Sequence, residues 1–306
     1  MFEKYYHFTR KPFSLTPDPD LFYLSHDHVE AVEHLIYGIT EGEGFLLLVG
    51  GIGTGKTTLS RVLTRKLNDS IIYSLILNPF QDFVTLLKGI ISDFGIKPCS
   101  DNKSDLINQL IHFLIVEVGP FGKTALIIID EAQNLSVETL EQLRLISNIE
   151  TDKEKLLQIL LLGQEELMQK LEMHQLRQLN QRISVRYFLT PLTRSELPAY
   201  IDHRIRLSRV EGATPITFTW TALHDIYKFS KGVPRLINML VGRCLVAGFV
   251  AETHIIDHSM VKRAKESLYG EKYRKIIRFK KKKERKIDEL DFGSLKQSAT
   301  GAGEES

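Results

Sequence analysis

The sequence has few cysteines and no long apolar run, and each absence excludes a class of protein. Its two cysteines, Cys99 and Cys244, lie far apart and form no CxxC pair, so we expect neither a disulfide framework nor a zinc site. No apolar run approaches the roughly 18 residues that a membrane-spanning helix needs. Residues 1–10 also lack the apolar centre of a signal peptide. These absences predict a soluble protein of the reducing cytoplasm.

The chain also has no strong excess of one charge. Its 40 Lys and Arg residues nearly balance 38 Asp and Glu residues, which gives a net charge of +2. Net charge alone therefore indicates no particular partner. With 306 residues, 43% of them apolar, the chain is long enough for one α/β domain and a smaller second domain, each with a buried core.

Short apolar runs alternate with amphipathic stretches over residues 44–190, which predicts a parallel sheet with crossover helices. The runs expected to form a five-stranded sheet are residues 45–49, 71–77, 124–129, 156–162 and 184–189. Helices are expected at residues 80–94, 105–118 and 136–149. We therefore predict an α/β core at residues 44–190, preceded by a linker segment at residues 1–43.

The strand pattern ends after Pro191, and only helical patterns follow it. Amphipathic stretches cover residues 194–210, 219–229, 234–251 and 257–268. They predict a small all-helical lid domain at residues 191–268. Residues 269–306 form a tail with a basic block, residues Arg274 to Lys286, followed by a Ser/Gly-rich end that we expect to be disordered.

A glycine-rich segment follows the first apolar run and precedes a helical pattern. Gly50, Gly55, Lys56 and Thr57 fill the phosphate-binding pattern GxxxxGK[ST]. In such a loop the backbone N–H groups surround phosphate oxygens, the lysine reaches the β- and γ-phosphates, and the Thr hydroxyl binds Mg²⁺. The residues predicted to bind ATP here are Gly50, Gly51, Ile52, Gly53, Thr54, Gly55, Lys56, Thr57 and Thr58. An ordinary glycine-rich turn is the alternative.

Two acidic residues, Asp130 and Glu131, end the apolar run at residues 124–129. A buried parallel strand delivers both carboxylates to the edge of the sheet where ligands bind. We predict that Asp130 coordinates Mg²⁺ together with Thr57, and that Glu131 polarises the water that attacks the γ-phosphate. The alternative for such a pair is a solvated turn or a helix cap.

Three further polar residues are candidates for the same site. Gln164, at the tip of the fourth strand, is either a sensor of the γ-phosphate or a helix cap. Arg182, with Arg177 as second choice, is predicted to reach into the nucleotide of a neighbouring subunit, and a surface ion pair is its alternative. Arg235 follows Pro234 at a helix start and is predicted to bind the γ-phosphate from the lid, unless the turn is only a cap.

With these motifs in place, residues 1–268 resemble an AAA+ ATPase, more narrowly one of the ExeA/GspA type. The segments that carry the narrower resemblance are Thr16-Pro17-Asp18-Pro19, Tyr23-Leu24-Ser25, Asp130-Glu131-Ala132-Gln133, Leu162-Gly163-Gln164 and Gln181-Arg182-Ile183. The resemblance implies a nucleotide-dependent homo-oligomer that uses ATP and Mg²⁺ and assists a secretin channel, a type IV pilus or an exopolysaccharide exporter. It also implies that Arg235 senses the nucleotide. The long family members continue into a membrane span and a peptidoglycan-binding domain, which this sequence does not show.

Two partners other than envelope proteins are compatible with the basic block. Residues 274–286 suit the anionic inner face of the cytoplasmic membrane. They equally suit DNA phosphates, which leaves an ATP-dependent DNA-binding adaptor of a transposition system as the alternative function. A solvated helix extension is the third interpretation. Pro12, Phe13, His28 and Tyr37 could line the adenine pocket or be ordinary packing residues.

Overall fold

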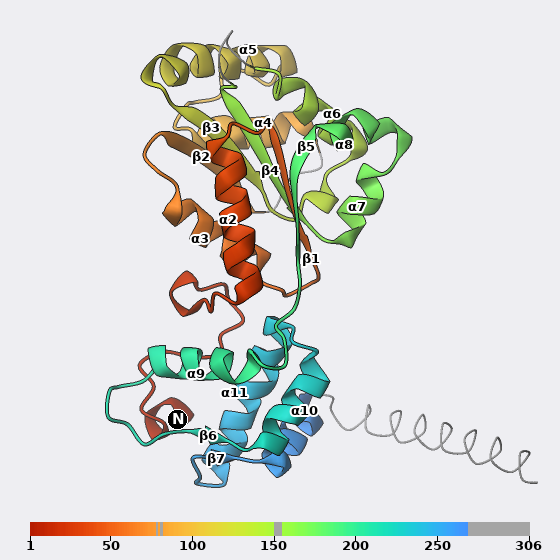
Figure 1. Ribbon diagram of the computed structural model, residues 1–306. Helices are drawn as coiled ribbons and strands as arrows, with labels where there is room; N and C mark the ends of the chain where they lie inside the picture. The colour runs from red at the N-terminus through yellow and green to blue at the C-terminus, as the bar shows by residue number, and fades with distance from the viewer. Residues whose placement is uncertain (78, 80–81, 150–154, 269–306) are drawn as a thin grey trace, which may run out of the picture.

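The structure, a computed structural model, describes residues 1–77, 79, 82–149 and 155–268. These residues form two units, a larger α/β unit and a smaller, mainly helical unit, with the N-terminus of the chain in the smaller one (Figure 1). In the part of the chain that is described, no helix combines the length and the apolar character that crossing a bilayer requires. The basic block at residues 274–286 lies outside the described residues.

The larger unit is built on a five-stranded parallel sheet. Its strands are β1 (Phe45–Gly50), β2 (Ile71–Ile76), β3 (Thr124–Ile129), β4 (Leu157–Gly163) and β5 (Ile183–Leu189), in the spatial order β2-β3-β4-β1-β5. The predicted five-stranded parallel sheet is therefore confirmed. Strand β4 lies between β1 and β3, so the glycine-rich loop and the acidic pair sit on either side of it.

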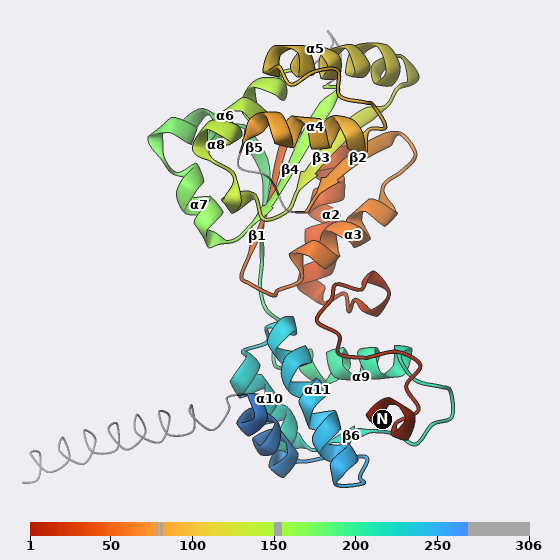
Figure 2. The same cartoon turned by 180° about the vertical axis from the view of Figure 1, so that it is seen from behind.

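Alternate side chains of the central strands face two separate apolar cores. Leu46 and Leu48 pack under α2 (His26–Thr40) and α3 (Lys56–Lys66), whereas Leu47 and Ile127 face the other layer of helices. That layer consists of α4 (Phe83–Asp93), α5 (Lys103–Phe113), α6 (Val137–Ile146), α7 (Glu165–Leu171) and α8 (Arg177–Arg182), as the reverse view shows (Figure 2). Burial on both faces explains why the strands are continuous apolar runs.

The predicted helix boundaries shift by a few residues where caps decide them. Helix α4 starts at Phe83 because Asp82 caps it, its Oδ1 accepting from the Thr85 N–H at 2.9 Å, whereas the sequence pattern suggested residue 80, which is not described. The stretch at 105–118 becomes α5 followed by a π-helical turn, Leu114–Val118. Caps are single-residue features that apolar periodicity does not reveal.

The smaller unit consists of α9 (Leu197–Leu207), α10 (Trp220–Ser230), α11 (Pro234–Val250) and helical residues 258–268. The prediction that strands stop after Pro191 needs one correction, because β6 (Thr217–Phe218) and β7 (Ile255–Ile256) pair in parallel. Strands of two residues are too short to produce an alternating apolar pattern.

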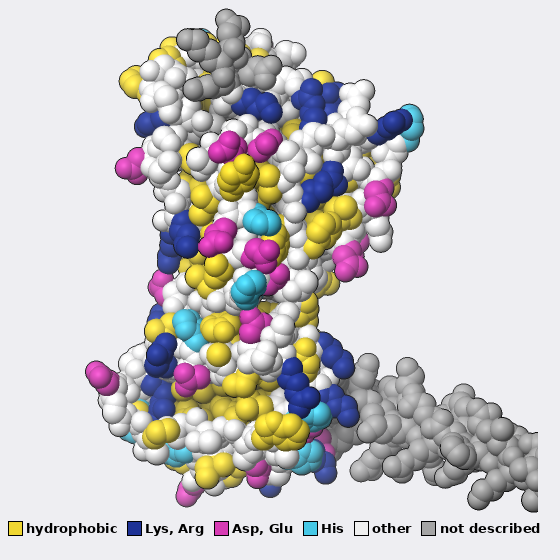
Figure 3. All heavy atoms as spheres, in the orientation of Figure 1, with side chains coloured by type: hydrophobic (Ala, Val, Ile, Leu, Met, Phe, Trp, Pro, Cys, Tyr) yellow, Lys and Arg dark blue, Asp and Glu magenta, His cyan; other side chains and the backbone are white. Residues whose placement is uncertain are grey.

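Residues 1–43, predicted to be a linker segment, are divided between the two units. Helix α1 (Phe2–Tyr5) and the buried rings of Tyr6, Phe8 and Phe13 join the core of the smaller unit, where the Tyr6 hydroxyl donates to the Thr253 carbonyl at 3.0 Å. Helix α2 covers the sheet instead, and Figure 3 shows its outer face, where acidic and histidine side chains gather. The N-terminal segment thus belongs to two folded units.

Gly232 fixes the turn where α11 begins beside the end of the sheet unit. Its φ is +81°, and its carbonyl accepts from the Leu192 N–H at 3.0 Å. A Cβ at this position would lie 1.9 Å from the Leu192 carbonyl oxygen. Because the obstacle is backbone, no side chain can move aside for it.

We expect Gly232→Ala to lower the free energy of unfolding more than Gly212→Ala does. Gly212 shares the left-handed backbone, with φ of +79°, but open space surrounds it. Its substitution should cost only the left-handed strain of about 1 to 2 kcal/mol. Gly232→Ala should cost about 2 kcal/mol more because of overpacking. Thermal unfolding followed by circular dichroism measures both, and equal losses would contradict the role of the Leu192 contact.

Candidate functional site

The glycine-rich loop leaves the buried end of β1 and leads directly into α3. Gly53 and Gly55 have φ values of +79° and +109°, and Gly55 is the N-cap of α3. Residues other than glycine rarely adopt such positive φ angles, which explains why glycine occupies positions 53 and 55. The loop therefore presents backbone N–H groups and the positive end of a helix dipole to the same space, as anion-binding loops do.

Lys56 is the first residue of α3 and is only 5% exposed. Its Nζ donates to the carbonyls of Gly50 at 2.8 Å and Gly51 at 3.1 Å. Burial lowers the pKa of this ammonium group, and the nearby charges of Glu131, Asp130 and Glu166 oppose that shift. The lysine is thus a buried cation that faces carboxylates and the inside of the loop.

Asp130 and Thr57 meet across the gap between β3 and α3. The Thr57 hydroxyl donates to Asp130 Oδ2, and the Glu131 N–H donates to Oδ1 at 2.9 Å. Asp130 is 1% exposed, and burial raises the pKa of its carboxyl group, against the effect of the Thr57 hydrogen bond. Both predicted metal ligands therefore offer oxygen atoms at one point.

The donor set suits Mg²⁺ better than a metal held by the protein alone. The described residues contain no group of three His, Cys, Asp or Glu side chains that could hold a metal. Mg²⁺ commonly binds through one or two carboxylates, with phosphate oxygens and water completing its octahedral shell. One carboxylate and one hydroxyl beside a phosphate-binding loop fit that pattern.

Glu131 is held in place by two glutamine side chains. Its Oε2 accepts from Gln164 Nε2 at 2.9 Å and also from Gln133 Nε2, while Gln133 Oε1 accepts from the Gln164 N–H at 3.2 Å. Glu131 has a φ of +53°, an uncommon angle for a residue with a side chain and one found at strained functional positions. The three side chains form one connected polar cluster at the ends of β3 and β4.

The side chain of Gln164 does not act as a helix cap. Gln164 occupies the N-cap position of α7, but its side chain makes no capping hydrogen bond and reaches Glu131 instead. Gln133, which we had named only as part of the family resemblance, joins the same cluster from a short 3₁₀ helix, Ala132–Asn134. Its position two residues after Glu131 was the only signal of that contact in the sequence.

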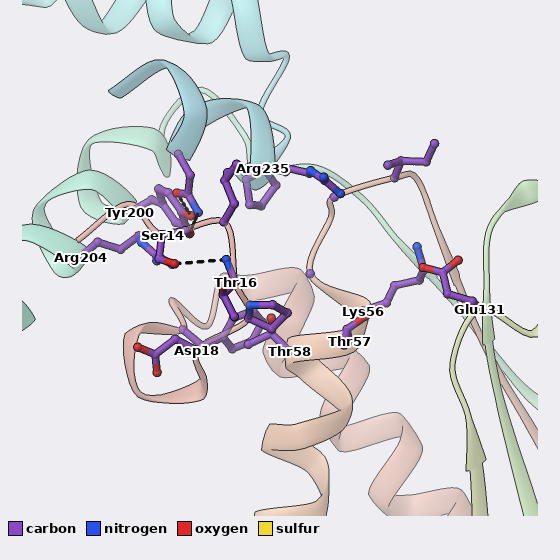
Figure 4. Close-up of a pocket in the computed structure, with 18 of the residues that line it drawn as sticks. Ser14, Thr16, Asp18, Lys56, Thr57, Thr58, Glu131, Tyr200, Arg204 and Arg235 are labelled. Atoms are coloured by element: carbon purple, nitrogen blue, oxygen red, sulfur yellow. Dashed lines mark hydrogen bonds between the residues drawn. The ribbon is translucent and has the colours of Figure 1, made fainter. Parts of the chain in front are cut away.

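Arg235 extends from the start of α11 toward the glycine-rich loop (Figure 4). Its backbone N–H donates to the Gly53 carbonyl at 3.2 Å, and a Cβ on Gly53 would lie 2.6 Å from the Arg235 Cβ. A single cavity lies along this contact, lined by the loop, by Glu131 and Gln164, by residues 14–18 and by Tyr200, Arg204 and Asn238. The predicted lid residue and the predicted loop therefore share one cavity.

Arg182 lies away from this cavity. It ends α8 just before Ile183, which pairs with Phe45 at the start of β1, whereas Leu189 pairs with Gly50. The length of β5 therefore separates Arg182 from the loop. Its exposed guanidinium donates to Asn148 Oδ1.

The two neighbouring arginines also lie outside this cavity. Arg177 is exposed at the start of α8. Arg186 binds Asn180 of the same chain, its Nη2 donating to Oδ1 at 2.7 Å.

His28, for which the sequence allows either an adenine-pocket or a packing role, lies buried behind the glycine-rich loop. Its Nε2 is 3.1 Å from the Thr54 carbonyl and its Nδ1 is 2.5 Å from the Ser25 hydroxyl. A carbonyl only accepts, so Nε2 carries the proton and Nδ1 accepts from Ser25. The Phe22 ring packs edge-on against the imidazole at 4.8 Å. Phe13 belongs to the core of the smaller unit, and Tyr37 is 65% exposed.

Comparisons with known proteins agree with this fold. Residues 39–171 match the protein family described as AAA domain. The general secretion pathway protein A of Aeromonas hydrophila is 40% identical over 270 residues, which cover 88% of this chain and 49% of that protein. The chain thus spans about half the length of this curated relative.

Solved structures with the same fold include proteins from Aeropyrum pernix and Pyrobaculum aerophilum. The Aeropyrum pernix ORC2 protein, in its ADPNP-ADP complexes, matches with a TM-score of 0.62 and 18% identity, covering 84% of this chain and 71% of its own. Cdc6p from Pyrobaculum aerophilum matches with a TM-score of 0.65 and 15% identity, covering 84% and 70%. At such identities these structures show a shared fold and nothing more.

The buried imidazole of His28 should make stability depend on pH. Burial holds its pKa below the ordinary value of about 6.5, although the Thr54 carbonyl, Asp27 and Glu196 oppose the shift. The contribution of His28 to the free energy of unfolding is therefore fully present above pH 6.5. Below that pH the unfolded chain binds a proton that the folded chain resists, so the contribution falls.

We expect the difference in melting temperature between wild type and His28→Gln to shrink as the pH falls from 7 to 5. His26→Gln is the matched control, because the His26 side chain is 91% exposed. Scanning calorimetry at several pH values gives both differences. The same pH dependence in both variants would contradict a neutral, buried His28.

Proposed function

This chain belongs to the AAA+ ATPases of the ExeA/GspA type, and from that premise we propose that it binds ATP with Mg²⁺ and hydrolyses it to ADP and phosphate. The observation that carries the proposal is that Lys56, Thr57 and Glu131 line one cavity, with the buried Asp130 accepting from the Thr57 hydroxyl. A phosphate-binding cation, a metal-binding oxygen pair and a candidate base are the parts that phosphoryl transfer to water requires.

Each part has a distinct proposed role. The backbone N–H groups of residues 50–58 bind the phosphates, and Lys56 turns its ammonium group from the loop carbonyls to the β- and γ-phosphate oxygens. Mg²⁺, held by Thr57 and Asp130, would neutralise charge that develops on those oxygens. Glu131 accepts a proton from the attacking water, and Gln164 and Gln133 orient its carboxylate.

Arg235 is the proposed link between nucleotide and lid. Its guanidinium belongs to the smaller unit, yet its backbone touches Gly53 of the loop. An arginine in that position can bind the γ-phosphate and release it after hydrolysis. The angle between the two units would then depend on the state of the nucleotide.

The partners are proposed from the curated relative. Its name ties that protein to the general secretion pathway. We propose that this chain acts as a homo-oligomer that assists a type II secretion, type IV pilus or exopolysaccharide export system. We also propose that it works in the cytoplasm, with peripheral contact to the inner face of the membrane through residues 274–286.

Replacing Lys56 and Glu131 separates binding from hydrolysis. Lys56→Ala should abolish ATP binding because it removes the buried cation from the loop. Glu131→Gln should retain binding and lower the turnover rate by roughly 10²- to 10⁴-fold, because the general base is lost. Calorimetry and phosphate release measure the two effects. Lys66→Ala, at the exposed end of α3, is the control. Equal loss of ATP binding in Lys56→Ala and Glu131→Gln would contradict these roles.

Arg182 should act on the nucleotide of a neighbouring subunit. Specific activity of the wild type should then rise with protein concentration, and Arg182→Ala should lower it by roughly 10³-fold or more, as removal of such arginines does elsewhere. Arg177→Ala, at the other end of α8, should have little effect.

Mixing two inactive variants tests this arrangement directly. In a mixture of Arg182→Ala and Glu131→Gln, a subunit with intact Glu131 can receive Arg182 from its neighbour. Phosphate release should therefore reappear on mixing. No recovery, together with activity that stays flat across dilution of the wild type, would show that Arg182 does not act between subunits.

A further inference from the structure

We propose that Arg204 of α9 is a positioning residue that ties both ends of the loop of residues 12–21 to the smaller unit, and that this loop forms the wall against the nucleoside of the bound nucleotide. The inference rests on the proposed function, since it concerns the same cavity. It adds a part of the site that lies outside the phosphate-binding motif. The loop includes the short 3₁₀ helix Pro19–Leu21.

Arg204 is a buried arginine whose hydrogen bonds go to backbone. It is 6% exposed, and its Nε donates to the Pro12 carbonyl at 2.7 Å while Nη1 donates to the Leu21 carbonyl at 3.2 Å. Its guanidinium carbon also lies 5.9 Å from the Phe13 ring centre and 5.7 Å from that of Tyr200. Among the described residues it makes no ion pair with a carboxylate. Two carbonyl dipoles and two aromatic faces therefore stabilise the charge.

The fork of the guanidinium matters for this contact. Pro12 and Leu21 are the two ends of the loop, so the one planar guanidinium group holds both ends together. A lysine ammonium is a point charge on a flexible stem and cannot reproduce a rigid fork that reaches two separate carbonyls. The arrangement thus requires arginine rather than any positive charge.

The loop is tied at other points to both units. The Tyr200 hydroxyl donates to Asn238 Oδ1 at 2.6 Å, and Asn238 Nδ2 donates to the Ser14 carbonyl at 3.2 Å. On its other side, Arg61 of α3 donates from Nη1 to the Pro17 carbonyl at 3.3 Å. The loop therefore bridges the lid and the helix that begins at Lys56.

The position of the loop identifies which part of the nucleotide it faces. Lys56 and Glu131 mark the phosphate end of the cavity. In Figure 4 the labelled residues Thr16, Asp18, Tyr200 and Arg204 lie away from Glu131, on the other side of the glycine-rich loop and α3. A nucleotide whose triphosphate occupies the first end must extend its sugar and base toward the second. Contacts made by residues 14–18 therefore depend on where Arg204 holds them.

The experiment compares binding of ATP with binding of inorganic tripolyphosphate, both with Mg²⁺, to full-length variants by calorimetry. In Arg204→Met the ATP dissociation constant should rise by roughly tenfold or more, because two hydrogen bonds from a charged donor are lost. Tripolyphosphate binding should stay within about twofold of wild type, since its contacts lie at the phosphate end. Arg206→Met is the matched control, because Arg206 lies on the same helix with an exposed side chain.

Two further measurements keep the test decisive. Arg204→Lys retains the charge and is expected to bind ATP as weakly as Arg204→Met. Wild-type affinity in Arg204→Lys would contradict the role of the guanidinium fork. Hydrogen exchange of the nucleotide-free protein should be faster at the amides of residues 12–21 in both Arg204 variants than in Arg206→Met. Unchanged exchange there, or equal weakening of ATP and tripolyphosphate, would also contradict that role.

Failure of the proposed function gives a different result. Wild-type protein that binds neither ATP nor tripolyphosphate would refute the nucleotide site itself. The exchange of residues 12–21 would still decide whether Arg204 holds the loop. Lys56→Ala, which should lose both ligands, shows that the two titrations report on the phosphate end.

Discussion

The insertion of β4 between β1 and β3 is the constraint on which the candidate site depends. Because all five strands are parallel, the ends of β1, β3 and β4 open at one edge of the sheet. That edge receives the glycine-rich loop, the acidic pair and Gln164 from three separate stretches of sequence. Gln164 can reach Glu131 only because β4 is the neighbour of β3. Strand order, more than any single residue, assembles the polar cluster.

Three charged side chains of the candidate site and its surroundings are almost fully buried. Lys56 at 5%, Asp130 at 1% and Arg204 at 6% exposure have all lost most of their water, which is costly for an ion without partners. Lys56 and Arg204 each donate to backbone carbonyls, and Asp130 accepts from Thr57 and the Glu131 N–H. A low local dielectric strengthens each contact and makes each partner hard to replace. In the proposed site, the Thr57–Asp130 contact holds the metal-binding oxygens in place, whereas Lys56 exchanges loop carbonyls for phosphate oxygens.

The two units are joined by a few contacts that involve backbone groups. Motion of one unit relative to the other therefore has to change few contacts of this kind. The Arg235 N–H donates to the Gly53 carbonyl, and the loop of residues 12–21 binds both Arg204 of α9 and Arg61 of α3. Hinges of this kind work through a few positions that absorb changes in backbone angle. The left-handed Gly53 lies at one of these contacts.

The sequence alone predicted the sheet, the loop and the acidic pair, because each is encoded by neighbouring residues: an apolar run such as 45–49, a glycine spacing, or two acids after a strand. It could not predict that Gln133 holds Glu131 or that β6 and β7 pair. It also gave no sign that the first 13 residues pack into the smaller unit. The contacts of Arg204 with Pro12 and of Arg235 with Gly53 join positions far apart in the chain. No local pattern records such contacts, since they arise only when packing of the apolar faces brings the two units together.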